Sequence, residues 1–215
     1  MSASVDEAMT TSKRQRVTAA VAWLAAGLAY LTLEGIAAAA FRPHYSYAHN
    51  FISDLGIPSS DSPLAWVMNT AFGVQGTLFL VGAILTVRAV EARKAGLFVS
   101  LAAANAVGNL LIAAFHSGPA SHANGTAWVH AIGAVLAIVG GNAAILAGSR
   151  IVSGWHRKVS VALGAFGLLS FALFVLELTA SSSLPLGILE RCSVYSITAW
   201  QLLIAAWLLS RRPTL

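Results

Sequence analysis

Six long apolar segments follow one another along the chain, and no other feature of the sequence constrains the fold as strongly. They span residues 17–41, 64–90, 95–115, 127–148, 159–178 and 193–209. A helix of about 20 apolar residues is long enough to cross the hydrocarbon core of a bilayer. The pattern therefore predicts an all-α membrane protein, a bundle of six transmembrane helices.

The composition supports this prediction. Of the 215 residues, 57% are hydrophobic and 10% are charged, whereas a soluble domain carries about 25% charged residues. So little charge cannot cover a water-exposed surface, which excludes a soluble globule and a disordered chain. The single cysteine, Cys192, also excludes a scaffold held by intramolecular disulfides.

Basic residues mark alternate connections of the predicted bundle. Eleven of the 13 lysines and arginines precede the first segment, follow the last, or lie in or beside the second and fourth connections. Connections rich in basic residues stay in the cytoplasm. We therefore expect a multi-pass protein of the cytoplasmic (inner) membrane, with both termini inside and outward-facing loops at residues 42–63, 116–126 and 179–192. These charges lie at helix ends, not in a patch with interleaved aromatic residues, so no nucleic-acid partner is expected.

Two predictions concern the N-terminal part of the chain. Residues 1–16 are predicted to form a polar cytoplasmic tail, and residues 17–212 a single six-helix domain. The first apolar segment has a basic flank and the small residues 37–40, as a signal peptide has. Because its apolar run is longer than that of a typical signal peptide and contains Glu34, an uncleaved anchor is favoured, with cleavage as the alternative.

Imidazole and carboxyl groups gather on the predicted outer side of the bundle. These groups ligate metals and carry out general acid–base catalysis, so a functional site is expected at this end. They belong to His44, His49, His116, His122, His130, Glu34, Asp54, Asp61, Glu177 and Glu190.

The first outer loop is the richest polar segment. Asp54 precedes a Leu-Gly pair, which indicates a turn or a short re-entrant piece whose backbone is buried in protein or lines a wet cavity. We expect this loop to fold back over the bundle. The alternative is a plain loop anchor, in which Asp54 caps a turn and the tyrosines lie at the membrane interface. The residues expected to meet there are Asn50, Asp54, His130, Glu190 and Arg191.

Three stretches resemble a known family. Tyr45-Ser46-x-x-x-Asn50-x-Ile52-Ser53-Asp54-Leu55-Gly56 is similar to the signature of bacterial and archaeal integral membrane proteins catalogued as domain of unknown function 998. His130, at the outer start of a later helix, and Gly187-Ile-Leu-Glu190-Arg191, before the last helix, match two further features. The resemblance runs from the first to the sixth helix and implies a six-helix membrane fold without a settled activity. His116 and His122 depart from the family pattern.

Three histidines suggest a metal site. Catalytic zinc is held by three protein ligands and a water molecule, and His116, His122 and His130 could supply the three. Their spacing matches no standard zinc motif. The alternative for His130 is a neutral imidazole that hydrogen-bonds between helices. The cofactor is therefore unknown, with a divalent metal such as zinc as a hypothesis.

Two glutamates, Glu34 and Glu177, lie inside apolar helices near their outer ends. A buried carboxylate is costly unless it is protonated, paired or facing water, so we expect one of them to pair with Arg191. The alternative is a pair that only locks helices together. Candidate substrate-binding residues are Arg191, Tyr45, Ser53, Glu34 and Glu177. Asn105 and Asn109, one helical turn apart, are interpreted as amides that pack helices together.

Two classes of function stay open. The first is a membrane enzyme acting on a lipid or isoprenoid-like molecule, as a metal-assisted hydrolase or as an acid–base cyclase or isomerase. The second is a non-enzymatic protein that binds or transports a lipid or small molecule, or an accessory subunit. Membrane lipids are expected partners in both, and no oligomeric state is predicted. The catalytic residues expected for the first class are Asn50, Asp54, His130 and Glu190.

Overall fold

A computed structural model describes residues 2–180 and 184–211, with side chains from residue 12 onward. Over these residues the chain is all-helical and contains no strand. The helices are α1 (Ser2–Ala40), α2 (Ala65–Ala89), α3 (Gly96–Ala114), α4 (Pro119–Ala123), α5 (Ala127–Gly148), α6 (Trp155–Ala180) and α7 (Leu186–Ser210). Arg212, the last predicted residue of the domain, and residues 181–183 of the predicted third outer loop lie outside the described residues.

Six of these helices, all except the short α4, are long and apolar enough to span a membrane. They match the six predicted segments one to one, and they make the chain a multi-pass membrane protein. Two helices are longer than predicted. Residues 2–16, predicted as a tail, are helical and continue into α1, and α7 begins at Leu186, about two turns before residue 193.

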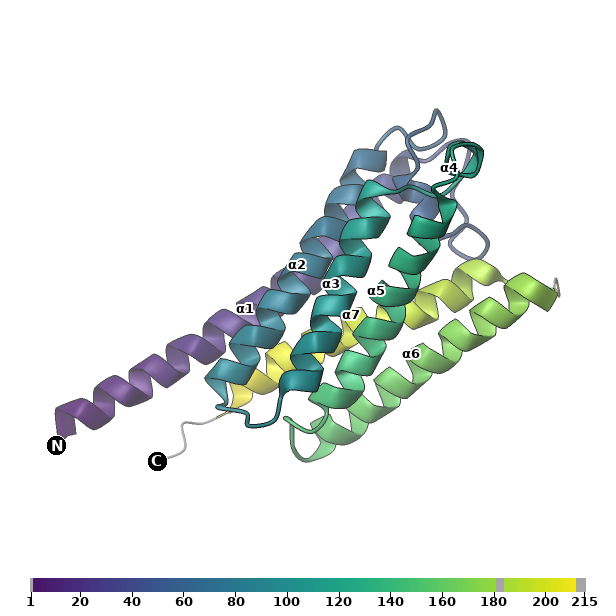
Figure 1. The fold of residues 1–215 in the computed structure, drawn as a ribbon. Coiled ribbons are helices and arrows are strands. Elements are labelled where there is room, and N and C mark those ends of the chain that lie inside the picture. The colour runs from purple at the N-terminus through teal and green to yellow at the C-terminus, as the bar shows by residue number, and fades with distance from the viewer. Residues whose placement is uncertain (1, 181–183, 212–215) are drawn as a thin grey trace.

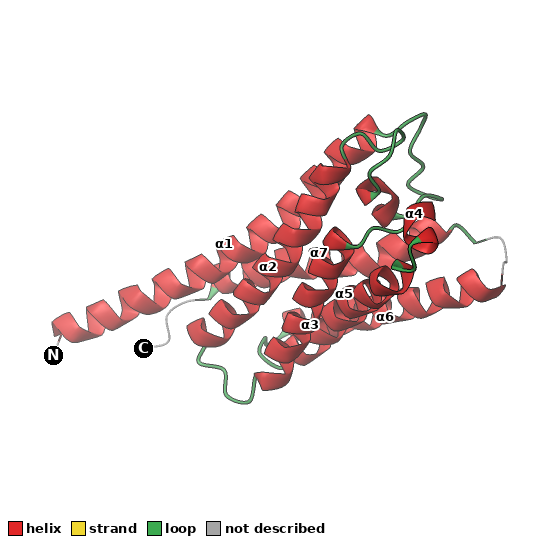
Figure 2. Cartoon of the chain, turned by 45° about the horizontal axis from the view of Figure 1, so that its top comes forward, coloured by secondary structure: helices red, strands yellow, loops and turns green. Residues whose placement is uncertain are grey.

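The six spans form a ring in chain order. Contacts join α1 to α2, α2 to α3, α3 to α5, α5 to α6 and α6 to α7, and α7 closes the ring against α1. Both termini lie at one end of the bundle, and α4 lies at the other, as two views show (Figure 1, Figure 2). We call the first the terminal end, and the second, where residues 41–64 connect α1 to α2, the loop end.

An aromatic cluster fills the half of the bundle nearer the terminal end. The ring of Trp23 meets Phe79 and Trp200 edge-on, with centroids 5.0 and 5.2 Å apart, and Phe98 packs against Trp200. Each indole N–H finds a hydroxyl: Trp23 Nε1 donates to Thr86 Oγ1 and Trp200 Nε1 donates to Ser160 Oγ, both at 2.9 Å. The indole N–H groups of Trp23 and Trp200 are therefore both hydrogen-bonded within this half.

A second core lies beneath the first loop. It joins side chains of α1, α2, α3 and α5 to side chains of residues 41–64, so the loop is part of the hydrophobic packing. Its buried members include Tyr30, Tyr45, Ile52, Leu55, Met68, Phe72 and Ile112.

Helices α3 and α5 approach each other closely at the base of this second core. A Cβ added at Gly108 would lie 2.6 Å from the carbonyl oxygen of Gly133, so only glycine allows the two backbones this separation. Small residues at such contacts are the usual means of packing membrane helices. The approach lets Asn105 Nδ2 donate to the carbonyl oxygen of Ala137 at 2.6 Å, as expected for an amide that joins helices.

Candidate functional site

The first loop, residues 41–64, folds back onto the loop end of the bundle. It contains a 3₁₀ turn, η1 (Ile52–Gly56), whose start is fixed by the Asp54 carboxylate, which accepts a hydrogen bond from the Phe51 N–H at 2.9 Å. Asn50 Oδ1 accepts another from the Ser46 N–H at 2.9 Å. Both side chains therefore shape the loop itself, as the turn-capping alternative predicted for Asp54.

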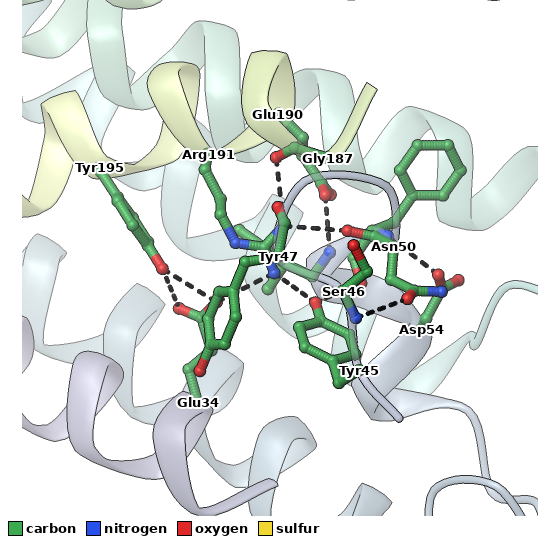
Figure 3. Close-up of polar contacts among 12 residues, drawn as sticks. Glu34, Tyr45, Ser46, Tyr47, Asn50, Asp54, Gly187, Glu190, Arg191 and Tyr195 are labelled. Carbon is green, nitrogen blue, oxygen red and sulfur yellow. Dashed lines mark hydrogen bonds and ion pairs between the residues drawn. The ribbon is translucent and has the colours of Figure 1, made fainter. Parts of the chain in front are cut away.

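Arg191, in the first turns of α7, holds this loop through its main chain. Its Nη1 donates to the carbonyl oxygens of Tyr47 and Asn50, each at 2.9 Å, and to that of Gly187 at 3.1 Å (Figure 3). The guanidinium also lies 5.3 and 4.8 Å from the ring centroids of Tyr45 and Tyr47. Loop backbone at a membrane end needs such internal partners, and Arg191 supplies several at once.

Glu34 of α1 is the counter-charge. Its Oε1 lies 3.3 Å from Arg191 Nη2, and Tyr195 OH donates to Oε1 and Oε2 at 3.0 and 3.1 Å (Figure 3). Arg191 Nη2 also donates to the Tyr45 hydroxyl. We call Glu34, Tyr45, Arg191 and Tyr195 the arginine cluster. It contains the ion pair predicted for one of the two glutamates, and that glutamate is Glu34.

A glycine allows α7 to meet the loop. A Cβ added at Gly187 would lie 2.6 Å from the carbonyl oxygen of Asn50 and 2.8 Å from that of Ala48. The next residue, Ile188, donates its N–H to the same Ala48 oxygen at 3.2 Å. The glycine that precedes the acidic–basic pair in the sequence is therefore needed for close backbone approach.

A cavity of about 50 Å³ lies between the first loop and helices α1, α2, α3, α5 and α7. Its polar lining comes from Ser53, Gln75, Asn105, Asn109, His130 and Glu190. Since a cavity needs about 10–15 Å³ to hold one water molecule, this one has room for about three or four waters or a small polar group. Asn105 Oδ1 is buried and has no hydrogen-bond partner among the described residues.

Two titratable groups share this cavity. Glu190 Oε2 accepts a hydrogen bond from the Ile52 N–H at 2.6 Å, which ties the cavity wall to η1. His130 Nδ1 lies 2.8 Å from the carbonyl oxygen of Phe115. A carbonyl oxygen can only accept, so Nδ1 carries the proton, and Nε2 is the nitrogen free to take one up when the ring is neutral.

Two groups of the first loop have shifted pKa values. Burial raises the pKa of the Asp54 carboxyl above its ordinary value, and hydrogen bonds from the Phe51 N–H and the Asn50 amide oppose this rise. Burial also raises the pKa of the Tyr45 phenol, against the nearby positive charge of Arg191. Tyr45 therefore keeps its proton throughout the physiological range.

The three histidines of the predicted metal site do not form one. His116 Nε2 lies 3.0 Å from Asn69 Nδ2, His130 is bonded to Phe115, and His122 is exposed on α4. Within the described part of the chain, no group of three or more histidine, cysteine, aspartate or glutamate side chains is placed to hold a metal ion. The geometry gives the zinc hypothesis no support.

The other predicted substrate-binding residues fall in different places. Ser53 lines the cavity, and Tyr45 is buried in the arginine cluster. Glu177 is buried near the end of α6, where its Oε1 accepts a hydrogen bond from the Leu184 N–H at 3.2 Å. Glu190 and Arg191, expected in a loop, lie inside α7; Glu190 borders the cavity and Arg191 is buried against the first loop.

Sequence reasoning missed part of this site. Tyr195 follows Arg191 by one helical turn and shares its face, a spacing that could have identified it. Asn105 and Asn109, predicted as packing amides, also line the cavity, together with Gln75. In the sequence of a single helix, an amide that packs against a neighbouring helix cannot be distinguished from an amide that borders a cavity.

The fold and the site define a class: a six-span integral membrane protein whose first loop is held over a small cavity by a buried ion pair. Residues 17–207 match the model of the family described as Protein of unknown function (DUF998), and the chain belongs to that family. No curated protein and no solved structure matches the chain.

Proposed function

We propose that this protein is a membrane enzyme that binds the polar end of an amphipathic, lipid- or isoprenoid-like molecule in the cavity beneath the first loop. The observation that carries the proposal is that two ionisable side chains, those of Glu190 and His130, border one cavity between helices that are long and apolar enough to span a membrane. Proton transfer needs an acid and a base within reach of the same substrate atoms. Ionisable groups at membrane depth are costly, and they mark function more often than packing.

The chemistry that suits this site is proton relocation, as in an isomerase or cyclase. His130 Nε2 takes a proton from one substrate carbon and Glu190 gives one to another, so atoms balance without a co-reactant. The amides of Gln75, Asn105 and Asn109 orient the polar group, and the unpartnered Asn105 Oδ1 accepts from a substrate hydroxyl.

The apolar part of the cavity lining suits an apolar substrate. Side chains such as Tyr30, Phe72, Ile112 and Val194 line the cavity beside the amides. A cavity of about 50 Å³ admits only a head or a chain end. The rest of such a molecule would remain in the surrounding membrane, which is why an amphipathic substrate fits better than a soluble one.

We further propose that the loop end faces outward and the terminal end faces the cytoplasm of a bacterial-type inner membrane. The described basic residues support this, since most lie in or beside the connections of the terminal end. In a Cys192→Ser background, a membrane-impermeant maleimide applied to intact cells should label Ser59→Cys, in the first loop, and spare Ser153→Cys, between α5 and α6. The reverse pattern would invert the topology.

The binding step is tested with the lipids that copurify with the protein. Ala134 lines the cavity, whereas Ala131, one turn earlier on α5, is exposed. Mass spectrometry of extracts should find an amphipathic compound with wild type and Ala131→Phe, and lose it with Ala134→Phe. Equal retention by both variants would show that the compound does not occupy the cavity.

The chemical step is tested by what the active-site variants retain. Glu190→Gln and His130→Gln should hold the unreacted compound, and wild type its isomer. The two have equal masses but different fragmentation patterns. The same isomer in all three proteins would contradict catalysis and leave a binding protein, the alternative class of function.

A further inference from the structure

A basic pocket lies at the terminal end of the bundle, far from the site described above. It has a volume of about 310 Å³ and is bordered by Arg93, Lys94, Arg150 and Arg211. These residues come from three separate parts of the chain: the α2–α3 connection, the α5–α6 connection and the residue that follows α7. The fold therefore brings together four cations that come from three separate places in the sequence.

Within the part of the chain whose side chains are described, none of these four cations forms an ion pair with a carboxylate. Among the side chains of residues 12–180 and 184–211, the one Lys or Arg ion pair with a carboxylate is that of Arg191 with Glu34. Four like charges around one pocket repel each other, and an anion that enters the pocket removes that repulsion.

Local features of the structure help to position two of these charges, those of Lys94 and Arg211. In the α2–α3 connection, Glu91 and Lys94 have φ angles of 50° and 60°, a left-handed conformation that is rare for residues other than glycine. The Arg211 guanidinium lies 4.8 Å from the ring centroid of Trp207. The 19-residue helix α3 begins beside the pocket, with Ala95 and Leu97 in the lining, and contributes the positive end of its dipole.

The pocket also has an apolar side. Phe98, Ala147 and Ile151 form part of its lining, and Leu97 is 60% exposed on the outer surface of the bundle. A cationic rim above an apolar floor matches a molecule that carries a phosphate at one end and acyl chains at the other. Clusters of Lys and Arg between transmembrane helices bind such headgroups.

We propose that this pocket binds a phosphate group, and that its source is the headgroup of an anionic membrane phospholipid. The site is independent of the cavity beneath the first loop. The guanidinium groups of Arg93, Arg150 and Arg211 donate to phosphate oxygens in pairs, while Lys94 contributes a point charge.

The test compares two variants that lose the same charge at the same end. Arg93→Gln/Arg150→Gln removes two lining cations, and Arg14→Gln/Arg157→Gln removes two exposed cations that do not line the pocket. Purified proteins are titrated with phosphatidylglycerol or phosphatidylcholine and followed by native mass spectrometry. Wild type should bind phosphatidylglycerol saturably and more tightly than phosphatidylcholine. The pocket variant should bind it about tenfold more weakly or worse, and the control variant nearly as wild type does.

Further measurements distinguish the possible outcomes of this experiment. Inorganic phosphate is titrated by calorimetry; if it binds to wild type and phosphatidylglycerol does not, the phosphate site stands and the lipid source is wrong. Equal weakening in both double variants would overturn the pocket, because general surface charge would then explain binding. All four substituted arginines are exposed, and unchanged melting temperatures would show that both variants fold.

Discussion

The two halves of the bundle are built from the same helices but are held together differently. Near the terminal end, Trp23, Phe79 and Trp200 pack edge-on, and each indole N–H is satisfied by one hydroxyl. Near the loop end, Arg191 and Glu34 form a buried ion pair that also binds main-chain oxygens of the first loop.

The difference follows from what each half must bury. The terminal half buries mainly helical segments, whose backbone groups are already paired internally, so apolar packing is largely sufficient. The loop half buries non-helical backbone, whose carbonyl oxygens need donors from elsewhere. One guanidinium, with five N–H donors in a fixed plane, can serve several of them at once. The intramembrane charges are thus explained first by the architecture of the first loop.

The largest expected effect is a loss of stability in the half of the bundle near the loop end. Arg191→Ala leaves Glu34 without its counter-charge and two loop carbonyls without their donor, and should lower the free energy of unfolding by about 3–5 kcal/mol. Arg191→Lys should lose nearly as much, because a single ammonium cannot reach both Glu34 and the loop carbonyls. Thermal unfolding in detergent measures both losses. Near wild-type stability of Arg191→Lys would reduce the arginine's role to charge alone.

The location of this damage sharpens the comparison. In Arg191→Lys, amide hydrogen exchange should accelerate in residues 41–56 and stay unchanged around Trp23 and Trp200. If exchange accelerated equally throughout the bundle, the two halves would form one cooperative unit.

A smaller effect is expected in the terminal half. Trp23→Phe keeps the aromatic packing but leaves the Thr86 hydroxyl without its donor. The expected loss is about 1–3 kcal/mol, the cost of an unsatisfied buried polar group. Thr86→Val in the same background should recover part of the loss, since it removes the stranded hydroxyl. A further loss in the double variant would mean that Thr86 has another role.

The smallest effect concerns pH. Because burial raises the pKa of Asp54 in the folded state, the folded protein binds this proton more readily than the unfolded chain does. Between the two pKa values, stability contributed by Asp54 therefore increases as the pH falls and is lost as the pH rises. Melting temperatures of wild type, compared with Asp54→Asn over pH 7 to 4, should rise slightly on acidification. A relative fall would show that the ionised carboxylate is the form the loop needs.

Much of the fold follows from the sequence, because hydropathy fixes six spans without any knowledge of how they pack. The start of α7 does not follow, since Glu190 and Arg191 lower the local hydropathy and make two helical turns look like a loop. Only the partners, Glu34 on α1 and Ile52 in the first loop, make those turns acceptable inside the bundle. Likewise, the density of polar residues in the first loop predicts that it folds back, but the cavity depends on how five helices meet.

The ion pair between α1 and α7 joins residues 157 positions apart in the chain. Synthesis proceeds at about 5–20 residues per second, so Glu34 is made about 8 to 30 seconds before Arg191. During that interval α1 must enter the membrane with a carboxyl group whose partner does not yet exist. The arginine cluster is therefore completed only once α7 has been made, and a chain released before α7 would leave Glu34 without its counter-charge and the first loop without its anchor.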